Sequence, residues 1–397
     1  MAFCNTFIPY GAYWCMPFCR WQGSLSHLHS LRLAADVASS FLKKRQIAAE
    51  AFDGLVLGTT VPQRHGFYGT PWLAGMIGAT ATTGPAVAQA CATSARIVAS
   101  AALEIETGQR ECILGMACDR TSNGPHIYYP DPKGRGGMGE AENPVWDNFN
   151  LDPFAGEAML QTAENVAREA GISRKEQDEI TLLRYQQYQT ALANDRAFQR
   201  RYMVPVQLAT GKKTESSVDA DEGVFATTAD GLAKLRPLLD GGSVTFGTQT
   251  FPADGNAGMV LCTKTRATQL GRDPKVTIQV LSYGEARVKK GFMPLAVVPA
   301  AFRALERAGI SIKDCRAIKT HNPFAVNDVY FSRQTGVPAN EVNRFGSPLI
   351  YGHPQAPTGL RAMIELCEEL VAAGGGYGLF SGCAAGDSAM GVVLKVS

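Results

Sequence analysis

Apolar runs and helical patterns alternate in the same order near both ends of the chain. Residues 53–60 (DGLVLGTT) form an apolar run with a glycine-rich exit, which predicts a buried strand. Residues 91–108 place apolar side chains at helical spacing, and 111–118 (ECILGMAC) form the next apolar run. Near the C-terminus a helical pattern over 358–373 again precedes an apolar run, at 376–383. This order of helix and buried strand is typical of α/β folds.

The two helix-and-strand segments align with each other without a gap. At a constant offset of 265 residues, five residues of the first segment meet an identical residue of the second: Thr93, Arg96, Glu104, Leu114 and Cys118 meet Thr358, Arg361, Glu369, Leu379 and Cys383. Together with the shared order of elements, these identities indicate an internally duplicated α/β architecture. We expect each half to form a right-handed crossover in a parallel or mixed sheet.

A different composition separates the two halves. Residues 119–160 are rich in Gly, Pro, Asn and Asp, which predicts loops. A charged helical pattern follows over 172–202, with Ser173 as its N-cap and Gln177 as the partner in an approximate capping box. Residues 211–231 are again polar and rich in turn formers. Because this region interrupts the repeated pattern, we interpret it as an insertion over one face of the core, where ligands commonly bind.

The chain is therefore expected to have four segments. They are an N-terminal core half (1–118), an inserted loop domain over the active site (119–247), a return to the N-terminal core (248–270) and a C-terminal core half (271–397).

Composition and charge narrow the classes of function. Hydrophobic residues make up 45% and charged residues 19% of the 397 residues, as in ordinary globular proteins. The net charge of +2 argues against binding to nucleic acid or to an acidic membrane surface. No run of about eighteen apolar residues is present, and the N-terminus lacks the pattern of a signal peptide. We therefore expect a cytoplasmic protein that binds neither nucleic acid nor membranes.

Ten cysteines are scattered along the chain in apolar or glycine-rich surroundings. Cys4, Cys15 and Cys19 lie close in sequence, but they form no CxxC pair and have no matching histidine cluster, so we predict no metal site. Cys91 differs from the others because it stands at the start of a predicted helix, where the helix dipole favours a thiolate. That position suits a nucleophile.

Other segments carry reactive side chains in turns rich in Gly and Pro. They are KTHNPFAVND (319–328), GSPLIYGHPQAPTG (346–359) and LFSGCAAGDSAMGVV (379–393). Three further segments precede them in the chain: CATSARIVASAALEIETGQ, TAENVAREAGISRKEQDE and LAKLRPLLDGGSVTFG. All six segments occur in the order of the thiolase motifs. The chain therefore resembles the thiolases, which are CoA-dependent acyltransferases, over nearly its whole length. The resemblance implies the thiolase fold, an α/β fold with a duplicated five-layer αβαβα core and an inserted loop domain.

The resemblance also implies a role for each reactive residue. Cys91 would accept the acyl group as a thioester, His353 would take its proton, and Cys383 would act as the second acid and base. His321, together with His353, would contact the thioester oxygen. Backbone N–H groups near Cys91 and in the turn that reaches Gly386 would stabilise a tetrahedral oxyanion, and Asn322 is expected to support the oxyanion or its turn.

Two segments depart from the common thiolase pattern. His321-Asn322-Pro323-Phe324 stands where thiolases carry Asn-Glu-Ala-Phe, so His321 replaces an asparagine, as in sterol-carrier-type thiolases, and Asn322 replaces an acidic residue. The turn after Cys383 is also longer than usual. A histidine can still donate a hydrogen bond to an enolate oxygen. The chemistry is therefore retained, while the pocket and the substrate must differ.

For the cofactor, the resemblance implies coenzyme A as a co-substrate and nothing tightly bound. Thr250 takes the place of a thiolase serine that contacts the pantetheine of CoA. Lys212 and Lys213 are candidates for contacts with the CoA phosphates.

For the substrate, aromatic segments at 64–72 and 126–130 and the His321 variant favour a bulky or aromatic 3-oxoacyl-CoA. The pattern is similar to that of thiolases of anaerobic toluene degradation, which cleave 2-benzoylsuccinyl-CoA into benzoyl-CoA and succinyl-CoA. The resemblance further implies a homodimer that pairs through its core sheets. It also suggests a small zinc-containing OB-fold partner subunit.

Two other functions stay open at this point. A decarboxylating condensing enzyme uses one cysteine and two histidines, which Cys91, His321 and His353 supply, but it has no need of a second thiol such as Cys383. A non-catalytic acyl or lipid carrier of the same fold typically lacks the nucleophile or the histidine, and both are present in this chain.

Overall fold

The computed structural model describes residues 2–210 and 214–397. Strands from distant parts of the chain build the first half of the core: β1 (Phe7–Pro9), β2 (Tyr13–Cys15), β3 (Cys19–Arg20), β4 (Gly54–Gly58), β5 (Ala86–Val87), β6 (Cys112–Arg120) and β11 (Ala253–Cys262). The second half contains β12 (Thr277–Arg287), β13 (Cys315–His321), β14 (Gly376–Ala384) and β15 (Ser388–Val396). The strands expected near 53–60, 111–118 and 376–383 are confirmed as β4, β6 and β14.

The two halves repeat one strand order. The path β12–β15–β14–β13 in the second half matches β1–β11–β6–β4 in the first, and both paths contain a parallel pair, β13 with β14 and β4 with β6. β1 is hydrogen-bonded to β11 on one side and to β12 on the other, so the halves share one 11-stranded sheet. This symmetry agrees with the duplication inferred from the sequence.

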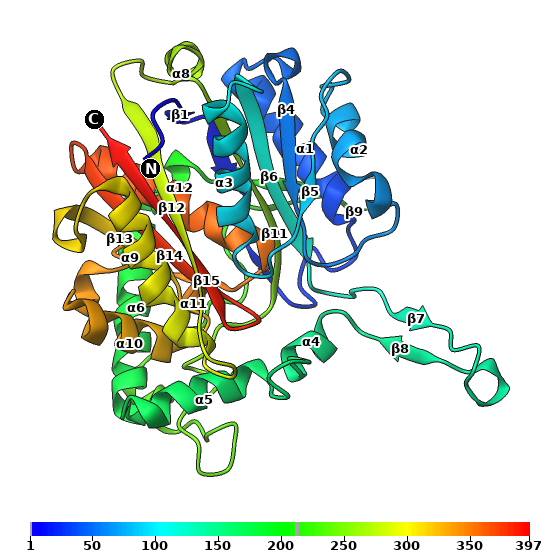
Figure 1. Ribbon diagram of the computed structural model, residues 1–397, viewed down its shortest axis with the longest axis vertical. Helices are drawn as coiled ribbons and strands as arrows, with labels where there is room; N and C mark the ends of the chain where they lie inside the picture. The colour runs from blue at the N-terminus through cyan, green and yellow to red at the C-terminus, as the bar shows by residue number, and fades with distance from the viewer. Residues whose placement is uncertain (1, 211–213) are drawn as a thin grey trace.

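Helices form three layers around and between the two halves of the sheet (Figure 1). α1 (Ser30–Arg45) and α2 (Gly69–Met76) pack on strands of the first half, and α9 (Val297–Ala308) packs on strands of the second. α3 (Thr93–Glu106) and α12 (Ala356–Ala372) lie in the middle, where they contact each other and strands of both halves. The result is a five-layer αβαβα core. None of the described helices is long and apolar enough to cross a membrane.

The two central helices are buried because sheets cover them on both sides. α12 buries every residue over 356–370, including charged ones. Its Arg361 is paired with Asp221 at 2.6 Å and with Glu365 at 3.1 Å, as charges out of contact with water must be. α3 fits the same narrow space through small side chains, among them the buried Ala95, Ala99, Ala101 and Ala102.

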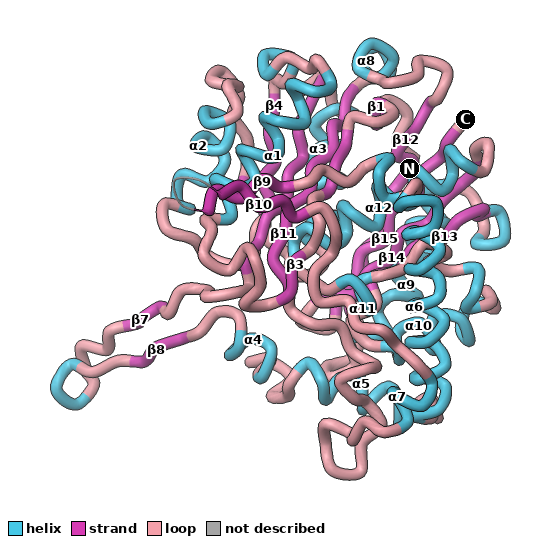
Figure 2. Tube along the Cα trace, turned by 180° about the vertical axis from the view of Figure 1, so that it is seen from behind, coloured by secondary structure: helices cyan, strands magenta, loops and turns pink. Residues whose placement is uncertain are grey.

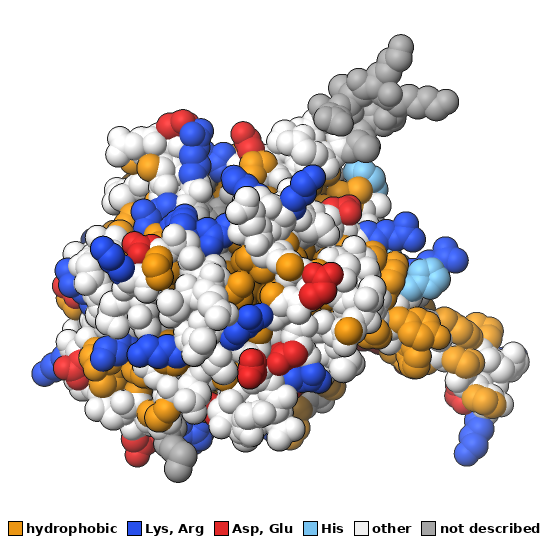
Figure 3. All heavy atoms as spheres, turned by 90° about the horizontal axis from the view of Figure 1, so that it is seen from above, with side chains coloured by type: hydrophobic (Ala, Val, Ile, Leu, Met, Phe, Trp, Pro, Cys, Tyr) orange, Lys and Arg blue, Asp and Glu red, His pale blue; other side chains and the backbone are white. Residues whose placement is uncertain are grey.

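Between β6 and β11 the chain leaves the core and forms short elements: β7 (Ile127–Tyr129), β8 (Glu140–Glu142), α4 (Trp146–Asn150), α5 (Met159–Glu169), α6 (Arg174–Arg196), β9 (Val206–Thr210), β10 (Thr214–Val218) and α7 (Ala229–Ala233). The expectation of loops over 119–160 is wrong in part, because β7 and β8 pair as a hairpin and α4 follows. The hairpin projects from the body of the molecule in two views (Figures 1 and 2), and Figure 3 shows hydrophobic side chains along it. The division into four segments stays a prediction.

The expected charged helix is α6, and its start is capped more completely than predicted. Ser173 is the N-cap, but its capping-box partner is Glu176, not Gln177. Glu176 occupies the third helical position, from which its carboxylate reaches the Ser173 N–H at 2.8 Å. Gln177 points inward instead and donates to Ser243 at 2.9 Å.

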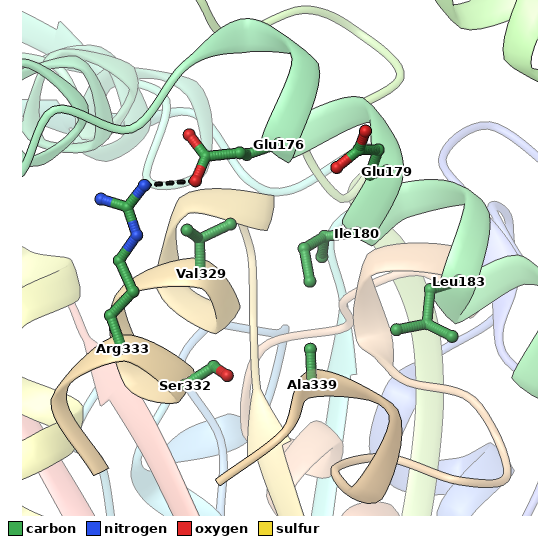
Figure 4. Close-up of a pocket in the computed structure, with 8 residues that line it drawn as sticks. All are labelled: Glu176, Glu179, Ile180, Leu183, Val329, Ser332, Arg333 and Ala339. Carbon is green, nitrogen blue, oxygen red and sulfur yellow. Dashed lines mark hydrogen bonds and ion pairs between the residues drawn. The ribbon is translucent and has the colours of Figure 1, made fainter. Parts of the chain in front are cut away.

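α6 is held against α10 (Ala325–Thr335), the helix that follows the HNPF segment. Arg184 of α6 forms a buried ion pair with Asp328 of α10 at 2.7 Å. A groove of about 350 Å³ lies between the two helices, and Figure 4 shows the Glu176–Arg333 ion pair across one end of it. The connecting helices α8 (Lys264–Leu270) and α11 (Pro348–Tyr351) complete the described helices. The contacts between α6 and α10 therefore fix the inserted region to the segment that carries His321.

Candidate active site

The predicted nucleophile sits in a tight turn directly before α3. Ala90 has a φ of +43°, a conformation that costs a residue other than glycine about 1–3 kcal/mol and that occurs at functional sites. Thr93 holds the turn by donating to the Ala90 carbonyl at 2.7 Å and accepting from the Gln89 N–H at 2.8 Å. The turn leaves Cys91 only partly buried. Its thiol is thereby presented at a fixed place.

A charged pair ties this turn to the other half of the core. Arg96 of α3 donates to Gln89 at 2.8 Å and forms an ion pair with Glu285 of β12 at 2.6 Å. Gln89 also donates to Glu285, at 2.7 Å. The nucleophile turn is therefore braced by the strand that begins the second half.

His353 faces the thiol from the Gly-His-Pro segment. Its Nε2 lies 3.1 Å from Cys91 Sγ, and its Nδ1 lies 2.7 Å from the hydroxyl of Thr358, which is in the first turn of α12. When Nδ1 carries the ring proton, its N–H donates a hydrogen bond to the Thr358 hydroxyl, and Nε2 then offers its lone pair to the thiol. This is the geometry of a nucleophile with its general base.

Burial keeps both partners neutral in the resting site. It raises the pKa of Cys91 to about 11, although the backbone N–H groups of Ala385 and Cys91 itself act in the opposite direction. Burial lowers the pKa of His353 to about 3. The expectation of a thiolate stabilised by the helix dipole is therefore wrong for the free protein. The helix begins only at Thr93, and desolvation of the thiol outweighs the N–H groups around it.

His321 is the last residue of β13 and lies against His353. The two ring centroids are 4.2 Å apart, and the rings are tilted by 37°. Neither ring nitrogen of the buried His321 has a hydrogen-bond partner among the residues that the structure describes. Burial and the neighbouring His353 both lower the pKa of His321, so its ring is neutral. A neutral imidazole with a free N–H can donate a hydrogen bond to an oxygen that enters the site.

The second predicted thiol lies beside the same cluster. Cys383 is in β14, the parallel neighbour of β13, and it is fully buried. Burial raises its pKa well above the ordinary value, and the nearby Cys91 raises it further. Asn327 of α10 donates to its sulfur at 3.2 Å. The structure thus brings Cys91, His353, His321 and Cys383 together from both halves of the core.

The donor atoms of Cys91, His321 and His353 lie within 4.8 Å of one another, a spacing that is also found in metal sites. His353 Nε2 is already engaged with Cys91 Sγ at 3.1 Å, which is the contact of a base with its nucleophile. The geometry suits acid–base chemistry better than coordination. All ten cysteines are free thiols: Cys4 is exposed, Cys91 and Cys315 are partly buried, and the others are buried.

Asn322 holds the HNPF turn and does not face the cluster. Its Nδ2 donates to Asp328 at 2.5 Å and to Ser347 at 3.0 Å, and its Oδ1 accepts from the Leu349 N–H. The amide is therefore fully occupied by the protein. Asn322 therefore supports the HNPF turn, and both N–H groups of its amide are engaged there and not with the expected oxyanion.

The remaining predicted site residues lie in loops. Thr250 donates to the Pro348 carbonyl at 2.5 Å, which places it beside the Gly-His-Pro segment. Gly386 has a φ of +80°, which the turn after β14 requires. Lys212 and Lys213 lie outside the described residues.

Two groups that sequence reasoning missed complete the cluster: the Thr358 hydroxyl behind His353 and the Asn327 amide at Cys383. The Ala385 N–H at Cys91 comes from the turn before Gly386, where backbone donors were expected. Thr358 carried a signal, because it aligns with Thr93 in the internal repeat and both threonines support a reactive residue. Nothing in the sequence around Asn327 singled it out.

Family models match most of the chain. The thiolase N-terminal domain matches residues 14–265, and the thiolase C-terminal domain matches 274–396. The chain belongs to the thiolase family. As a thiolase, the protein is an acyltransferase with CoA-dependent thiolase chemistry.

Relatives and solved structures agree with this assignment. The thiolase is 28% identical to an acetyl-CoA acetyltransferase of Escherichia coli, over 94% of its own length and 95% of the relative. It is 30% identical to an acetyl-CoA acetyltransferase of Chromobacterium violaceum, over 94% and 95%. The crystal structure of the Bacillus anthracis acetyl-CoA acetyltransferase has a TM-score of 0.91, with 25% identity and 100% coverage of both chains. Human mitochondrial 3-ketoacyl-CoA thiolase in complex with CoA shares the fold, with a TM-score of 0.91 at 23% identity over 100% and 99% of the chains.

Proposed function

We propose that this thiolase cleaves a 3-oxoacyl-CoA, or forms one in the reverse Claisen direction, through an acyl-enzyme on Cys91. The observation that carries the proposal is the 3.1 Å contact between Cys91 Sγ and His353 Nε2, with Thr358 behind the imidazole. A thiol needs a base within this distance to become a nucleophile as it attacks.

In the first half-reaction, Cys91 Sγ attacks the 3-oxo carbon of the substrate while its proton passes to His353 Nε2. The carbonyl electron pair moves onto oxygen, and the backbone N–H groups of Cys91 and Ala385 stabilise this oxyanion. When the oxyanion collapses, the bond between the α-carbon and the former 3-oxo carbon breaks. Its electron pair forms the enolate of the departing acyl-CoA.

The enolate is then protonated. His321 and His353 donate hydrogen bonds to its thioester oxygen. This role suits His321, whose ring nitrogens have no partner among the described residues. Cys383 gives its thiol proton to the α-carbon, and the shortened acyl-CoA leaves. Cys383, now a thiolate, takes the proton of the incoming CoA thiol. The CoA sulfur attacks the acyl-enzyme, and His353 returns its proton to Cys91 as the new acyl-CoA forms.

Coenzyme A acts in this scheme as a free co-substrate. The structure of a related thiolase with CoA supports its binding to this fold. We assign Thr250 to the pantetheine channel, because it borders the Gly-His-Pro segment that carries His353. Lys212 and Lys213 are assigned to the CoA phosphates on sequence grounds alone.

We further propose a bulky or aromatic 3-oxoacyl-CoA as the substrate, with 2-benzoylsuccinyl-CoA as the reference compound. On this proposal the chain is the thiolase subunit of a benzoylsuccinyl-CoA thiolase in aromatic degradation. His321 in place of asparagine supports an altered pocket. The aromatic segment 64–72 lines an open surface hollow of about 490 Å³ with His65, Tyr68 and Trp72. The segment 126–130 gives no support, because it belongs to the projecting β7–β8 hairpin.

For the assembly, we propose a homodimer that forms through the sheet edge at β5, together with a small zinc-containing OB-fold partner. β5 ends the strand path, and no other strand of the described residues pairs with its outer edge, which a second copy could therefore extend. Exposed apolar side chains on the hairpin, Tyr128, Tyr129 and Met138, offer a surface for a partner. Light scattering of the purified chain tests the dimer, and co-purification with the partner tests the second contact.

Intact-protein mass spectrometry tests the function itself. The chain is mixed with acetyl-, benzoyl-, succinyl- or malonyl-CoA and then mapped by peptide. We expect an added acyl mass on Cys91 that free CoA removes, and the acyl group that is retained best identifies the substrate class. Labelling from malonyl-CoA with loss of carbon dioxide would point to a condensing enzyme. The absence of any adduct, with and without a partner subunit, would refute the proposal.

A further inference from the structure

The second thiol has one side-chain partner whose role the scheme above leaves open. Asn327 Nδ2 lies 3.2 Å from Cys383 Sγ, and both residues are buried. Asn327 is in the first turn of α10, three residues after the HNPF segment that begins with His321 ends. A buried contact between a primary amide and a reactive thiol can influence the proton transfer that the thiol carries out.

The direction of this hydrogen bond favours one protonation state of the thiol. The NH₂ group of an asparagine can only donate, so the sulfur of Cys383 must accept. A neutral thiol is a weak acceptor, whereas a thiolate accepts strongly because the hydrogen bond is then assisted by charge. Asn327 accordingly lowers the pKa of Cys383, against the rise caused by burial. The titratable groups that act on this thiol electrostatically are Cys91, from the turn before α3, and Asp328, from α10.

The amide is held in place by the residue that follows it. Asp328 accepts from Arg184 Nε at 2.7 Å, from Thr320 Oγ1 at 2.8 Å and from Asn322 Nδ2 at 2.5 Å. These groups are buried and come from α6, β13 and the HNPF turn. The first turn of α10 is therefore fixed on three sides, and Asn327 is aimed at Cys383 before any substrate binds.

We infer that Asn327 is a positioning residue of the reaction, whose amide holds Cys383 at the substrate α-carbon and stabilises its thiolate. The inference rests on the proposed function. In the condensation direction the α-carbon–hydrogen bond breaks, its electron pair enters the enolate, and the proton goes to Cys383 Sγ. In cleavage the same proton returns from sulfur to carbon. Asn327 itself neither gives nor accepts a proton.

The test separates the proton step from acyl transfer. Asn327→Asp keeps the size of the side chain but removes the donor, and Asn327→Ala removes the side chain. Asn194→Asp makes the same chemical change at an exposed site on α6 and serves as the control. The proton step is measured as exchange of the acetyl-CoA methyl protons in D₂O by NMR, across neutral and alkaline pH. Acyl transfer is measured as the rate of acetylation of Cys91 by mass spectrometry.

We expect both Asn327 variants to lose about 10- to 100-fold in the exchange rate, the range for a lost hydrogen bond to a charged group. Acetylation of Cys91 should fall far less than exchange in both variants, because Cys383 there gives its proton to the CoA sulfur, which leaves much more readily than a carbanion. It should be unchanged in the control, and the acetylation that remains shows that the variants are folded. The pH at which exchange reaches half its maximum should move upward in Asn327→Ala.

Three results would overturn the inference. Equal losses in exchange and in acetylation would indicate a purely structural role. Unchanged exchange in both variants would indicate no role. A downward move of the exchange profile in Asn327→Ala would mean that the amide is reversed and that its oxygen, which has no partner among the described residues, accepts from the thiol. A wild-type chain that neither exchanges protons nor acetylates Cys91 would instead refute the proposed function.

Discussion

The hydroxyl of Thr358 determines which nitrogen of His353 can act as a base, and this can be tested by a single substitution. Thr358 is fully buried, and its Oγ1 lies 2.7 Å from His353 Nδ1. Thr358→Val keeps the shape of the side chain and removes only the hydrogen-bonding group. Water cannot take its place at a position with no exposed surface. His353 Nδ1 is then left buried without a partner, or the ring changes to the tautomer that points its proton at Cys91.

The cost follows from the loss of one buried hydrogen bond. A buried group left unsatisfied costs about 1–3 kcal/mol, which corresponds to a fall of about 5- to 150-fold in the rate of acyl transfer. Thr358→Ser keeps the hydroxyl and should retain most of the rate. The assay is the rate of acyl-enzyme formation on Cys91 after rapid quenching, with the melting temperature as a check on folding. A folded Thr358→Val variant with the wild-type rate would refute the assignment of His353 as a base oriented by Thr358.

Four further predictions follow from the same geometry. Cys91→Ser should abolish the acyl-enzyme in intact-mass spectra while circular dichroism stays that of the wild type; a surviving adduct would place the nucleophile elsewhere. Cys383→Ala should slow carbon–carbon cleavage far more than exchange of the acyl group between Cys91 and labelled CoA, and equal losses would contradict its role as the second acid and base. Since burial raises the pKa of Cys91 to about 11, its alkylation by iodoacetamide in the free protein should rise about tenfold per pH unit through the alkaline range; a rate that is already constant at acidic pH would reveal a preformed thiolate. Arg184→Met leaves the buried Asp328 without its ion-pair partner and should cost about 3–5 kcal/mol of unfolding free energy in urea denaturation, and no change would show that the α6–α10 contact is unimportant.

The core was predictable because its signals are local. β4, β6 and β14 could be predicted because a strand that is buried on both faces is a continuous apolar run in the sequence. The reactive residues could be predicted from the order of the family motifs, which contain Cys91, His321, His353 and Cys383. The predicted capping box was wrong by one residue. Its partner stands three positions after Ser173, which is Glu176, and Glu176 has a charged carboxylate where Gln177 has a neutral amide. The sequence contained enough information for that assignment.

Other features depend on contacts that no local pattern reveals. Asn327 meets Cys383 across 56 positions of sequence, and only the folded pairing of β13 with β14 brings α10 to that thiol. The neutral state of Cys91 also depends on the folded structure. The sequence reveals the helix that follows Cys91, but it does not reveal that burial desolvates the sulfur and raises its pKa. The β7–β8 hairpin is built from short strands in a stretch dominated by turn formers, so composition outweighed the short Ile127–Tyr129 run.

The strand that joins the two halves is synthesised long before its partner strand in the second half. β1 occupies residues 7–9, and its partners on β12 are residues 277–279. A growing chain therefore keeps one edge of β1 unpaired until residues 277–279 have emerged from the ribosome, and contacts so distant in sequence are slow to form. Neither half can complete its hydrogen bonding alone, although each repeats the same pattern. We expect the protein to fold and unfold as one cooperative unit. A chain cut before β12 should expose the unpaired edge of β1, which can form hydrogen bonds with strands of other molecules.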